Sequence, residues 1–336
     1  MKKLNVAING FGRIGRTFFR QAFGNSDISI VAINDLTDLA TLEYLLKYDT
    51  VYGRYDKAVE SSDGSLVVGG TPVRHLAEKD PKNLPWRDLG VDVVVESTGF
   101  FTTADAAKAH LDAGAKRVVI TAPAKGEVAT LLVGTNDAGF GGAQPITCNA
   151  SCTTNATAPV IAILHEAFGI EKTLMTTVHG YTATQKLVDG VDGKDPRRGR
   201  AAAQNIVPST TGAAEAVIQS IPEMNGIFDA VSLRVPTITG SLTDVTALLK
   251  KETTVEEINA VFEKAAQDPR WSKVLKTTTD PIVSSDIIGE PYGAIIDLSL
   301  TRVTGGNLVK VFSWYDNEWG YSATLLKHIL QVGESL

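Results

Sequence analysis

The stretch Asn9-Gly10-Phe11-Gly12-Arg13-Ile14-Gly15-Arg16 decides the fold of the first half of this chain. Its glycines follow the pattern G-x-G-x-x-G, after the apolar run 4–9 and before a helical pattern over 14–22. A strand, a glycine turn and a helix in this order are typical of a doubly wound, Rossmann-type parallel sheet. The glycines let the backbone approach a pyrophosphate group, which the helix N-terminus stabilises. The sequence therefore predicts a dinucleotide site at Gly10, Phe11 and Gly12.

A carboxylate follows the second strand expected in this half, which spans Ile28 to Asn34. Asp35 lies about 20 residues after the last glycine of the turn, where a carboxylate accepts hydrogen bonds from a ribose 2′-hydroxyl. Because the same carboxylate repels a 2′-phosphate, the pattern favours NAD over NADP. The alternative is a structural turn followed by a surface aspartate, and the strand–turn–helix context favours the nucleotide site.

The rest of the first half alternates apolar strands with helical patterns, which is typical of a parallel sheet covered on both faces. The segment 59–77 differs, because Asp63-Gly64 and Gly69-Gly70 separate short β-prone runs and predict hairpins. The other elements expected here are helices at 39–46 and 104–113, strands at 91–96, 117–121 and 130–134, and a strand ending at Cys148.

The pattern changes after Cys152. A long apolar helix at 153–168 and a strand at 173–178 precede the polar, Arg-rich segment 182–205, which has little periodicity. A loop of that length within a compact domain is typical of a functional or interface segment. Strands at 230–236, 243–250 and 307–314 and helices at 255–266 and 318–332 predict a mixed or antiparallel sheet. The expected fold class is therefore α/β: a Rossmann-type doubly wound parallel sheet plus an α+β catalytic domain.

Composition narrows the class of protein. The chain has 336 residues, enough for two domains, and its formal net charge of -6 argues against a general nucleic-acid binder. No apolar run approaches the ~20 residues that a membrane span needs, and the first residues do not resemble a secretory signal. Cys148 and Cys152 have neither a redox C-x-x-C spacing nor a zinc pattern. We therefore expect free thiols, no metal and a cytoplasmic location.

Cys152 lies at the start of an expected helix, with Ser151 and Thr153 as small polar neighbours. A helix N-terminus and a nearby imidazole both favour the thiolate, which is the nucleophilic form of cysteine. His179 follows the strand at 173–178, and it meets Cys152 only if this strand runs beside the first turn of the helix. The alternative is a buried, inert cysteine and a structural histidine.

A thiolate beside a nicotinamide ring predicts the oxidation of an aldehyde. The sulfur adds to the carbonyl carbon, and the thiohemiacetal then transfers a hydride to the cofactor and becomes a thioester. His179 is expected to take the hydroxyl proton and, as a cation, to stabilise the thiolate and the oxyanion. The thioester is then cleaved by water or by another nucleophile.

Three parts of the sequence predict anion binding. The segment 209–214 begins a helical pattern with hydroxyls and free amides, an arrangement that also serves as a simple helix cap. Arg234 ends an apolar strand, where a buried charge needs an anionic partner. Arg197, Arg198 and Arg200 add positive charge to the long loop, unless they form a solvated or subunit-contacting face. Two anion sites suit a phosphorylated substrate and inorganic phosphate, with phosphorolysis of the thioester.

With these residues in view, the chain resembles the phosphorylating glyceraldehyde-3-phosphate dehydrogenase family. The resemblance runs from end to end, and the cysteine and tryptophan motifs are its most specific parts. The motifs that carry it are Asn9 to Arg16, Ser97-Thr98-Gly99-Phe100-Phe101, Ala150 to Asn155, His179 to Gln185, Ser209 to Ala214 and Trp314-Tyr315-Asp316-Asn317-Glu318-Trp319-Gly320-Tyr321-Ser322.

The resemblance implies NAD-dependent conversion of glyceraldehyde 3-phosphate and inorganic phosphate to 1,3-bisphosphoglycerate by a cytoplasmic homotetramer of glycolysis or gluconeogenesis. It implies an NAD-binding domain at 1–151, completed by the C-terminal helix 316–336, and a catalytic domain at 152–315. Cys152 is then the nucleophile and His179 the base. Around NAD, the resemblance places Arg13, Ile14, Asp35, Lys79, Thr121 and Asn317. For inorganic phosphate or the migrating substrate phosphate it implies Ser151, Thr153, Arg198, Thr211 and Gly212, and for the C3 phosphate of the substrate Thr182, Thr184 and Arg234.

Two other functions stay open at this point. An erythrose-4-phosphate dehydrogenase shares the fold and finishes with hydrolysis instead of phosphorolysis. A catalytically silent NAD-binding protein serves partner recognition or regulation, and the intact Cys152 and His179 count against it.

Overall fold

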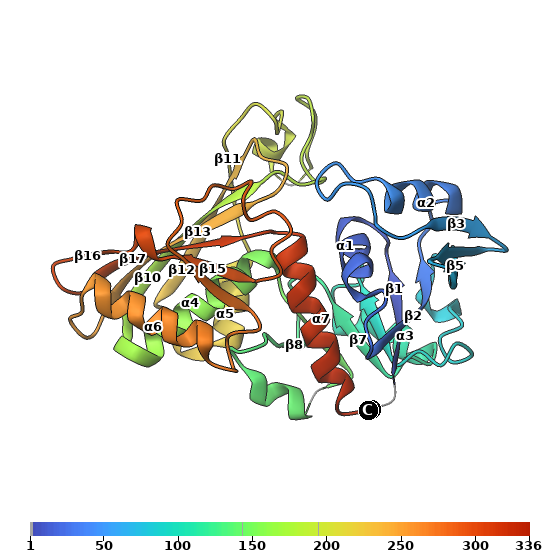
Figure 1. The fold of residues 1–336 in the computed structure, drawn as a ribbon, viewed down its shortest axis with the longest axis horizontal. Helices are drawn as coiled ribbons and strands as arrows, with labels where there is room; N and C mark the ends of the chain where they lie inside the picture. Colours follow the sequence, from blue (N-terminus) through green and yellow to red (C-terminus); the bar gives the residue numbers. More distant parts are fainter. Residues whose placement is uncertain (1–2, 143, 194) are drawn as a thin grey trace. The chain divides into compact units, whose positions relative to one another are not determined.

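The computed structural model describes residues 3–142, 144–193 and 195–336 and divides into two compact units. The first unit comprises the residues up to Leu131, Asp137–Ala150 and Leu325–Leu336, and the second comprises Leu132–Asn136 and Ser151–Thr324. Each unit is built around a β-sheet of its own (Figure 1).

The first unit has a nine-stranded sheet in the order β3-β4-β5-β2-β1-β6-β7-β9-β8. The chain leaves β1 towards β2 on one side and reaches β6 on the other, and both neighbours run parallel to β1. The carboxyl ends of β1 and β6 are therefore the switch point at which such sheets bind ligands. The strands are β1 (Leu4–Asn9), β2 (Ile28–Asn34), β3 (Val59–Ser62), β4 (Ser65–Val68), β5 (Thr71–Leu76), β6 (Val93–Glu96), β7 (Arg117–Ile120), β8 (Ala129–Thr130) and β9 (Ile146–Cys148), and the helices are α1 (Arg13–Ala22), α2 (Leu39–Lys47) and α3 (Ala104–Asp112).

The turn between β1 and α1 requires two of its glycines. Gly10 has φ +93°, and a Cβ atom there would lie 2.7 Å from the backbone nitrogen of Thr98. A Cβ atom on Gly15 would lie 2.2 Å from the carbonyl oxygen of Gly10, so α1 packs directly against the turn. Gly12 is the N-cap of α1 and makes no side-chain capping hydrogen bond. The predicted strand–turn–helix arrangement is confirmed.

The predicted hairpins also form, because β3 pairs antiparallel with β4 and β4 with β5, with turns at Asp63-Gly64 and Gly69-Gly70. The strand predicted at 130–134 is wrong, since β8 ends at Thr130. The apolar residues that follow are buried in a turn in which the Thr135 N–H donates to the Leu132 carbonyl (3.0 Å), and Gly134 adopts φ +85°. These buried apolar residues do not alternate with polar ones, and such a run looks like a buried strand in the sequence although it forms a turn.

The second unit has an eight-stranded mixed sheet in the order β11-β12-β10-β13-β17-β15-β14, with β16 paired to β17. The predicted combination of a Rossmann-type sheet and a mixed sheet is confirmed. In Figure 1, α4, α5 and α6 lie on one face of this sheet. The strands are β10 (Ile170–Gly180), β11 (Val207–Ser209), β12 (Phe228–Val235), β13 (Ser241–Leu249), β14 (Leu275–Thr278), β15 (Ala294–Asp297), β16 (Arg302–Thr304) and β17 (Leu308–Tyr315), and the helices are α4 (Cys152–Phe168), α5 (Ala213–Ser220) and α6 (Val255–Gln267).

In the part of the second unit that the structure describes, helices cover one face of the sheet, and buried and half-buried residues alternate along the whole of β13. On the other face, the side chains of Leu174 in β10 and Val231 in β12 are 66% and 54% exposed. The last helix, α7 (Trp319–Gly333), contains the boundary between the two units at Thr324 and Leu325. Among the helices described, none combines the length and the apolar character needed to cross a bilayer.

Candidate active site and nucleotide site

The second unit places a thiol beside an imidazole. α4 begins at Cys152, and its N-cap residue Ser151 accepts a hydrogen bond from the Thr154 N–H through its hydroxyl (3.1 Å). His179 lies near the end of β10, with its Nε2 atom 3.4 Å from the Cys152 Sγ atom. β10 therefore runs beside the first turn of α4. The sequence predicted that Cys152 and His179 meet only under this condition.

The register of the sheet places the cation Arg234 beside the Cys152–His179 pair. β10 and β12 are parallel, and His179 is the register partner of Arg234. The Arg234 Nη1 atom and the Gly180 carbonyl oxygen each lie 2.6 Å from the His179 Nδ1 atom. One ring nitrogen cannot donate to the carbonyl and accept from the guanidinium in the same tautomer. With the proton on Nδ1 donated to Gly180, the Nε2 lone pair faces the sulfur and can take a proton.

Burial and Arg234 set the ionisation of both groups. Desolvation raises the pKa of the Cys152 thiol, and the Arg234 guanidinium is the strongest influence in the opposite direction. Desolvation and the same guanidinium lower the pKa of His179 to about 3. The resting pair is therefore a thiol and a neutral imidazole. In the resting pair the cation that favours the thiolate is Arg234, and the expected histidine cation forms only when the ring takes up a proton.

Tyr315 is a member of this site that the sequence analysis did not assign. Its hydroxyl lies 3.0 Å from the Thr153 Oγ1 atom and 2.8 Å from that of Thr177, and its ring meets the His179 ring edge to face at 5.9 Å. Burial raises the pKa of this phenol above its usual range. Tyr315 ends the strand β17 and is the second residue of the motif that begins at Trp314, which was the signal available for it.

The predicted anion-binding residues lie in several places within the second unit. The hydroxyls of Thr182 and Thr184 are 2.9 Å apart in the loop after β10. Thr211 and Gly212 precede α5, where the Thr211 hydroxyl accepts from the Ala213 N–H (3.1 Å). Arg198 lies close enough to Arg234 to help lower the pKa of that guanidinium, after the larger effect of desolvation.

The first unit holds a cavity of about 500 Å³ at the switch point of its sheet. Predicted cofactor residues on its wall are Gly10, Gly12, Asp35 and Lys79. Asp35 accepts a hydrogen bond from the Phe11 N–H (2.7 Å) and so ties the glycine turn to the end of β2. The Phe11 side chain is buried and packs edge to face against Phe19, so it is not available to a ligand.

Other predicted cofactor residues are held by the protein itself. Arg13 forms an ion pair with Asp49, and Ile14 is half-buried in the first turn of α1. The Thr121 hydroxyl donates to the Glu96 carbonyl (3.1 Å). In the second unit, the Asn317 side-chain oxygen accepts from the Gly240 N–H (3.1 Å) and from a serine hydroxyl.

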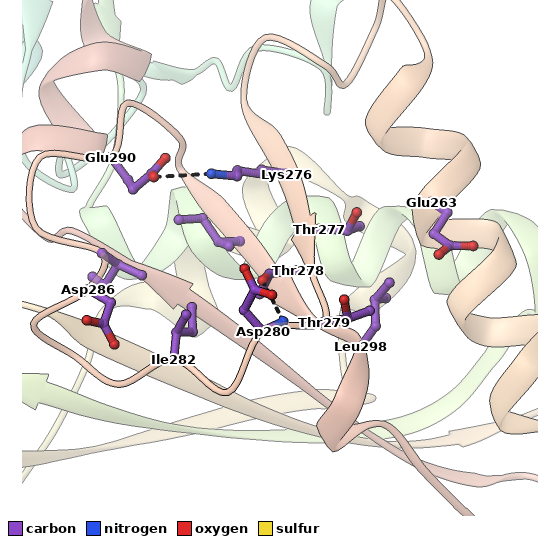
Figure 2. Close-up of a pocket in the computed structure, with 12 residues that line it drawn as sticks. Glu263, Lys276, Thr277, Thr278, Thr279, Asp280, Ile282, Asp286, Glu290 and Leu298 are labelled. Atoms are coloured by element: carbon purple, nitrogen blue, oxygen red, sulfur yellow. Dashed lines mark hydrogen bonds and ion pairs between the residues drawn. The ribbon is translucent and has the colours of Figure 1, made fainter.

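A second cavity, of about 510 Å³, lies in the second unit and contains none of the predicted site residues. Figure 2 shows Lys276 extended towards Glu290, with which it forms an ion pair (3.1 Å). In the ranges that the structure describes, no three His, Cys, Asp or Glu side chains are grouped to hold a metal ion. Both cysteines are free thiols, and Cys148 is buried.

The Rossmann-type unit with its cavity and the thiol–imidazole pair define a class of protein, the dinucleotide-dependent oxidoreductases with an active-site cysteine. Residues 4–104 match the family model for the NAD binding domain of glyceraldehyde 3-phosphate dehydrogenase, and residues 151–317 match the model for its C-terminal domain. The glyceraldehyde-3-phosphate dehydrogenase of Mycobacterium avium is 53% identical over 99% of both chains. That of Borreliella burgdorferi is 51% identical over 96% of this chain and 98% of its own.

The chain therefore belongs to the glyceraldehyde-3-phosphate dehydrogenase family. It is an NAD-dependent oxidoreductase, and its cofactor is NAD.

Proposed function

We propose that this chain oxidises glyceraldehyde 3-phosphate with NAD and transfers the acyl group to inorganic phosphate, giving 1,3-bisphosphoglycerate. The observation that carries the proposal is the 3.4 Å separation between the Cys152 sulfur and the His179 Nε2 atom, with Arg234 on the far side of the ring. Family membership over nearly the whole chain supports the same reaction and favours it over erythrose-4-phosphate oxidation or a silent binding role.

In the proposed mechanism Cys152 attacks the aldehyde carbon. His179, with its Nδ1 proton donated to the Gly180 carbonyl, accepts the thiol proton at Nε2 and passes it to the aldehyde oxygen as the thiohemiacetal forms. The neutral ring then takes the hydroxyl proton back as the hydride leaves. NAD, when bound, accepts the hydride. The backbone N–H groups in the first turns of α4 and α5 stabilise the negative charge that develops on the substrate oxygen and the charge of the attacking phosphate.

Arg234 is the proposed contact for the C3 phosphate, together with Thr182 and Thr184. When an anion pairs with this guanidinium, the His179 Nδ1–H can donate to the Gly180 carbonyl. This tautomer leaves the Nε2 lone pair free, as a general base requires. For inorganic phosphate or the migrating substrate phosphate, the proposed contacts are Ser151, Thr153, Arg198, Thr211 and Gly212. The Thr153 hydroxyl already contacts Tyr315, so its expected contribution is its backbone N–H.

The proposed NAD site belongs to domain 1–151, completed by helix 316–336, and the proposed catalytic domain is 152–315. The residues proposed to contact NAD are Gly10, Phe11, Gly12, Arg13, Ile14, Asp35, Lys79, Thr121 and Asn317. A ribose hydroxyl on Asp35 is the proposed reason for a preference for NAD over NADP.

We propose a cytoplasmic homotetramer. The exposed apolar side chains of Leu174 and Val231, on adjacent strands of the uncovered sheet face, support an interface with a second copy. The exposed residues Leu187 and Val191 in the loop 182–205 support a second contact of this kind.

The test is NADH formation from glyceraldehyde 3-phosphate, with and without inorganic phosphate, and with erythrose 4-phosphate as the rival substrate. We expect phosphate-dependent turnover that Cys152→Ser reduces by several orders of magnitude, because a serine hydroxyl rarely ionises there. Cys148→Ser is the matched control and should keep its turnover. Oxidation that proceeds equally well without phosphate would reject the assignment.

A further inference from the structure

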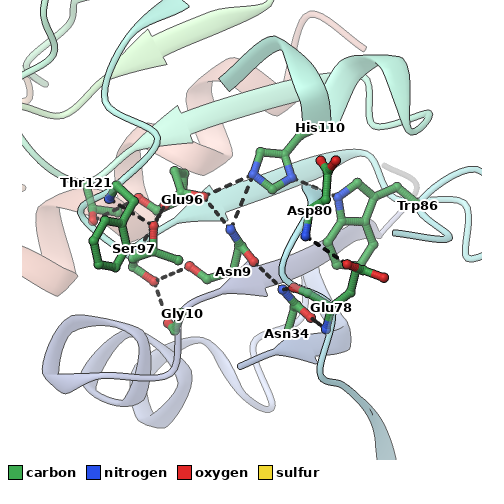
Figure 3. Close-up of polar contacts among 12 residues, drawn as sticks. Asn9, Gly10, Asn34, Glu78, Asp80, Trp86, Glu96, Ser97, His110 and Thr121 are labelled. Carbon is green, nitrogen blue, oxygen red and sulfur yellow. Dashed lines mark hydrogen bonds and ion pairs between the residues drawn. The ribbon is translucent and has the colours of Figure 1, made fainter. Parts of the chain in front are cut away.

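A buried carboxylate lies below the nucleotide cavity. Glu96 ends β6, next to the end of β1, and is only 1% exposed. Figure 3 shows the side chains of Asn9 and His110 beside it. The Thr98 hydroxyl also contacts its carboxylate. Burial of a carboxylate is costly unless hydrogen bonds compensate it, so the direction of each hydrogen bond around Glu96 matters.

One chain of hydrogen bonds reaches Glu96 from β2. The Glu78 backbone N–H, which can only donate, donates to the Asn34 side-chain oxygen (2.9 Å). The Asn34 amide group therefore faces Asn9 and donates to its side-chain oxygen (2.7 Å). The amide group of Asn9 then donates to Glu96 Oε2 (2.6 Å). The backbone donor at the start thus fixes the orientation of both asparagines.

A second chain reaches Glu96 from α3. The Trp86 indole N–H, also a donor only, donates to the His110 Nδ1 atom (3.0 Å). The ring proton of a neutral His110 must then be on Nε2, which donates to Glu96 Oε2 (3.0 Å). Trp86 and His110 are fully buried, and neither lines the cavity.

The other carboxylate oxygen also receives only donors. Glu96 Oε1 accepts from the Thr98 backbone N–H (2.9 Å) and from the Thr98 hydroxyl. The Asn9 amide group, the His110 Nε2–H and the Thr98 backbone N–H can only donate to this side chain, and the Thr98 hydroxyl can donate to it as well. The two chains and Thr98 therefore converge on the acceptor oxygens of Glu96.

We propose that Glu96 is a positioning residue for the dinucleotide: it sets the affinity for the adenosine half of NAD by orienting cavity residues that it holds from beneath. The cavity wall includes Asn9, Asn34, Glu78 and Thr98, all joined to Glu96 directly or through one chain. Asp35, the expected ribose contact, lies on the same wall. The inference rests on the proposed function only in taking this cavity as the NAD site.

Glu96→Gln tests the inference, because an amide of equal size has one acceptor oxygen and one donor group. Whichever way it turns, its NH₂ group faces donors, so either Thr98 or the two chains lose their acceptor. We expect the Kd for NAD and for ADP-ribose, measured by calorimetry, to rise about 10- to 100-fold. At saturating NAD, kcat and the KM for the aldehyde should change less than about twofold.

Asp92→Asn is the matched control. Asp92 precedes the same strand at its other end, is also buried (3% exposed), and accepts from the Asn5 N–H (2.9 Å) and the Lys116 ammonium (2.7 Å). This variant should lower the Tm of the protein and leave both Kd values near those of the wild type. If Asp92→Asn weakens both ligands as much as Glu96→Gln, general loosening of the first unit explains the effect and the inference is overturned.

His110 provides a test that spares the carboxylate. Gln at this position can accept from Trp86 and donate to Glu96, whereas Leu can do neither. We expect His110→Gln to keep the affinity for ADP-ribose and His110→Leu to lose it about tenfold. If Glu96→Gln does not fold, His110→Leu decides, and an unchanged Kd in that variant overturns the inference. Intact ADP-ribose binding in a wild-type protein without turnover would reject the proposed function and leave this inference standing.

Discussion

Arg234 influences both partners of the thiol–imidazole pair, since its guanidinium favours the Cys152 thiolate and disfavours the His179 cation. Removing it in Arg234→Leu should raise the pKa of the Cys152 thiol further. Above neutral pH, where His179 is uncharged, less thiolate is then present at any given pH. We expect the rate of alkylation of Cys152 by iodoacetamide at about pH 8 to fall about tenfold, with the inflection of the rate–pH profile displaced to higher pH.

A Cys152→Ser variant, in which only the buried Cys148 can react, measures the background of this labelling. An inflection that moves to lower pH in Arg234→Leu would show that the imidazole, and not the guanidinium, controls the thiol.

Single residues differ in how far their role could be predicted. Cys152 and His179 occur in motifs of small polar residues, which mark chemistry even without a structure. The contact between His179 and Arg234 depends on the register of β10 and β12, which no local pattern specifies. Glu96 ends a strand of valines and looks like a strand terminus, because its partners come from elements far apart in the sequence.

Among the elements, the turn that joins β1 to α1 contains two glycines with different expected roles. Gly12 is expected to contact the ligand, and Gly15 is needed for the packing of α1. Gly12→Ala adds a methyl group where no atom lies within 4 Å, at an ordinary φ of -71°, so we expect an unchanged Tm. Because Gly12 lines the cavity that we propose as the NAD site, the Kd for NAD should rise about tenfold or more.

Gly15→Ala should instead lower the stability of the protein. Its methyl group would lie 2.2 Å from the Gly10 carbonyl oxygen, so α1 must shift. We expect a Tm lower by several degrees, consistent with an overpacking cost of about 1–3 kcal/mol. Thermal unfolding without ligand, compared with NAD titration, separates the two variants. A Tm loss in Gly12→Ala equal to that in Gly15→Ala would contradict this division.

Most elements could be predicted because periodicity and glycine punctuation are local signals. β1 and β2 have the predicted bounds, and α4, α6 and α7 lie where apolar spacing indicated helices. The short strands β14 and β15 were not predicted, since four residues give too little alternation to recognise. Their place in the sheet comes from pairing with each other and with β17.

For the whole molecule, two buried histidines make the stability depend on pH in acid. Burial lowers the pKa of His328 from 6.5 to about 3, and His179 is also lowered to about 3. Below about pH 6.5 the unfolded chain binds protons that the folded chain does not bind, so stability is greatest above this pH and is lost as the pH falls towards 3. The loss per histidine approaches about 1.4 kcal/mol per pH unit.

His328→Gln should make the decline shallower. In the wild type, the ring accepts from the Thr147 hydroxyl (2.8 Å) and donates to the Leu131 carbonyl (3.1 Å), and a glutamine side chain can make both contacts without titrating. We expect similar Tm values at neutral pH and a higher Tm in the variant at about pH 5. Parallel Tm–pH curves for the two proteins would count against this account.

The hydrogen bonds that orient Asn9 also bear on how the protein ages. An asparagine followed by glycine is prone to deamidation, in which the next backbone nitrogen attacks the side-chain carbonyl carbon to form a succinimide. At Asn9-Gly10 both ends of the amide are engaged, and the Gly10 N–H donates to the Asn34 carbonyl (2.8 Å), so the attacking atom is held away. Asn225-Gly226 lies in an exposed turn. During storage of the folded protein, we therefore expect chemical damage of this type to accumulate at Asn225 and to spare Asn9, where a new aspartate would repel Glu96.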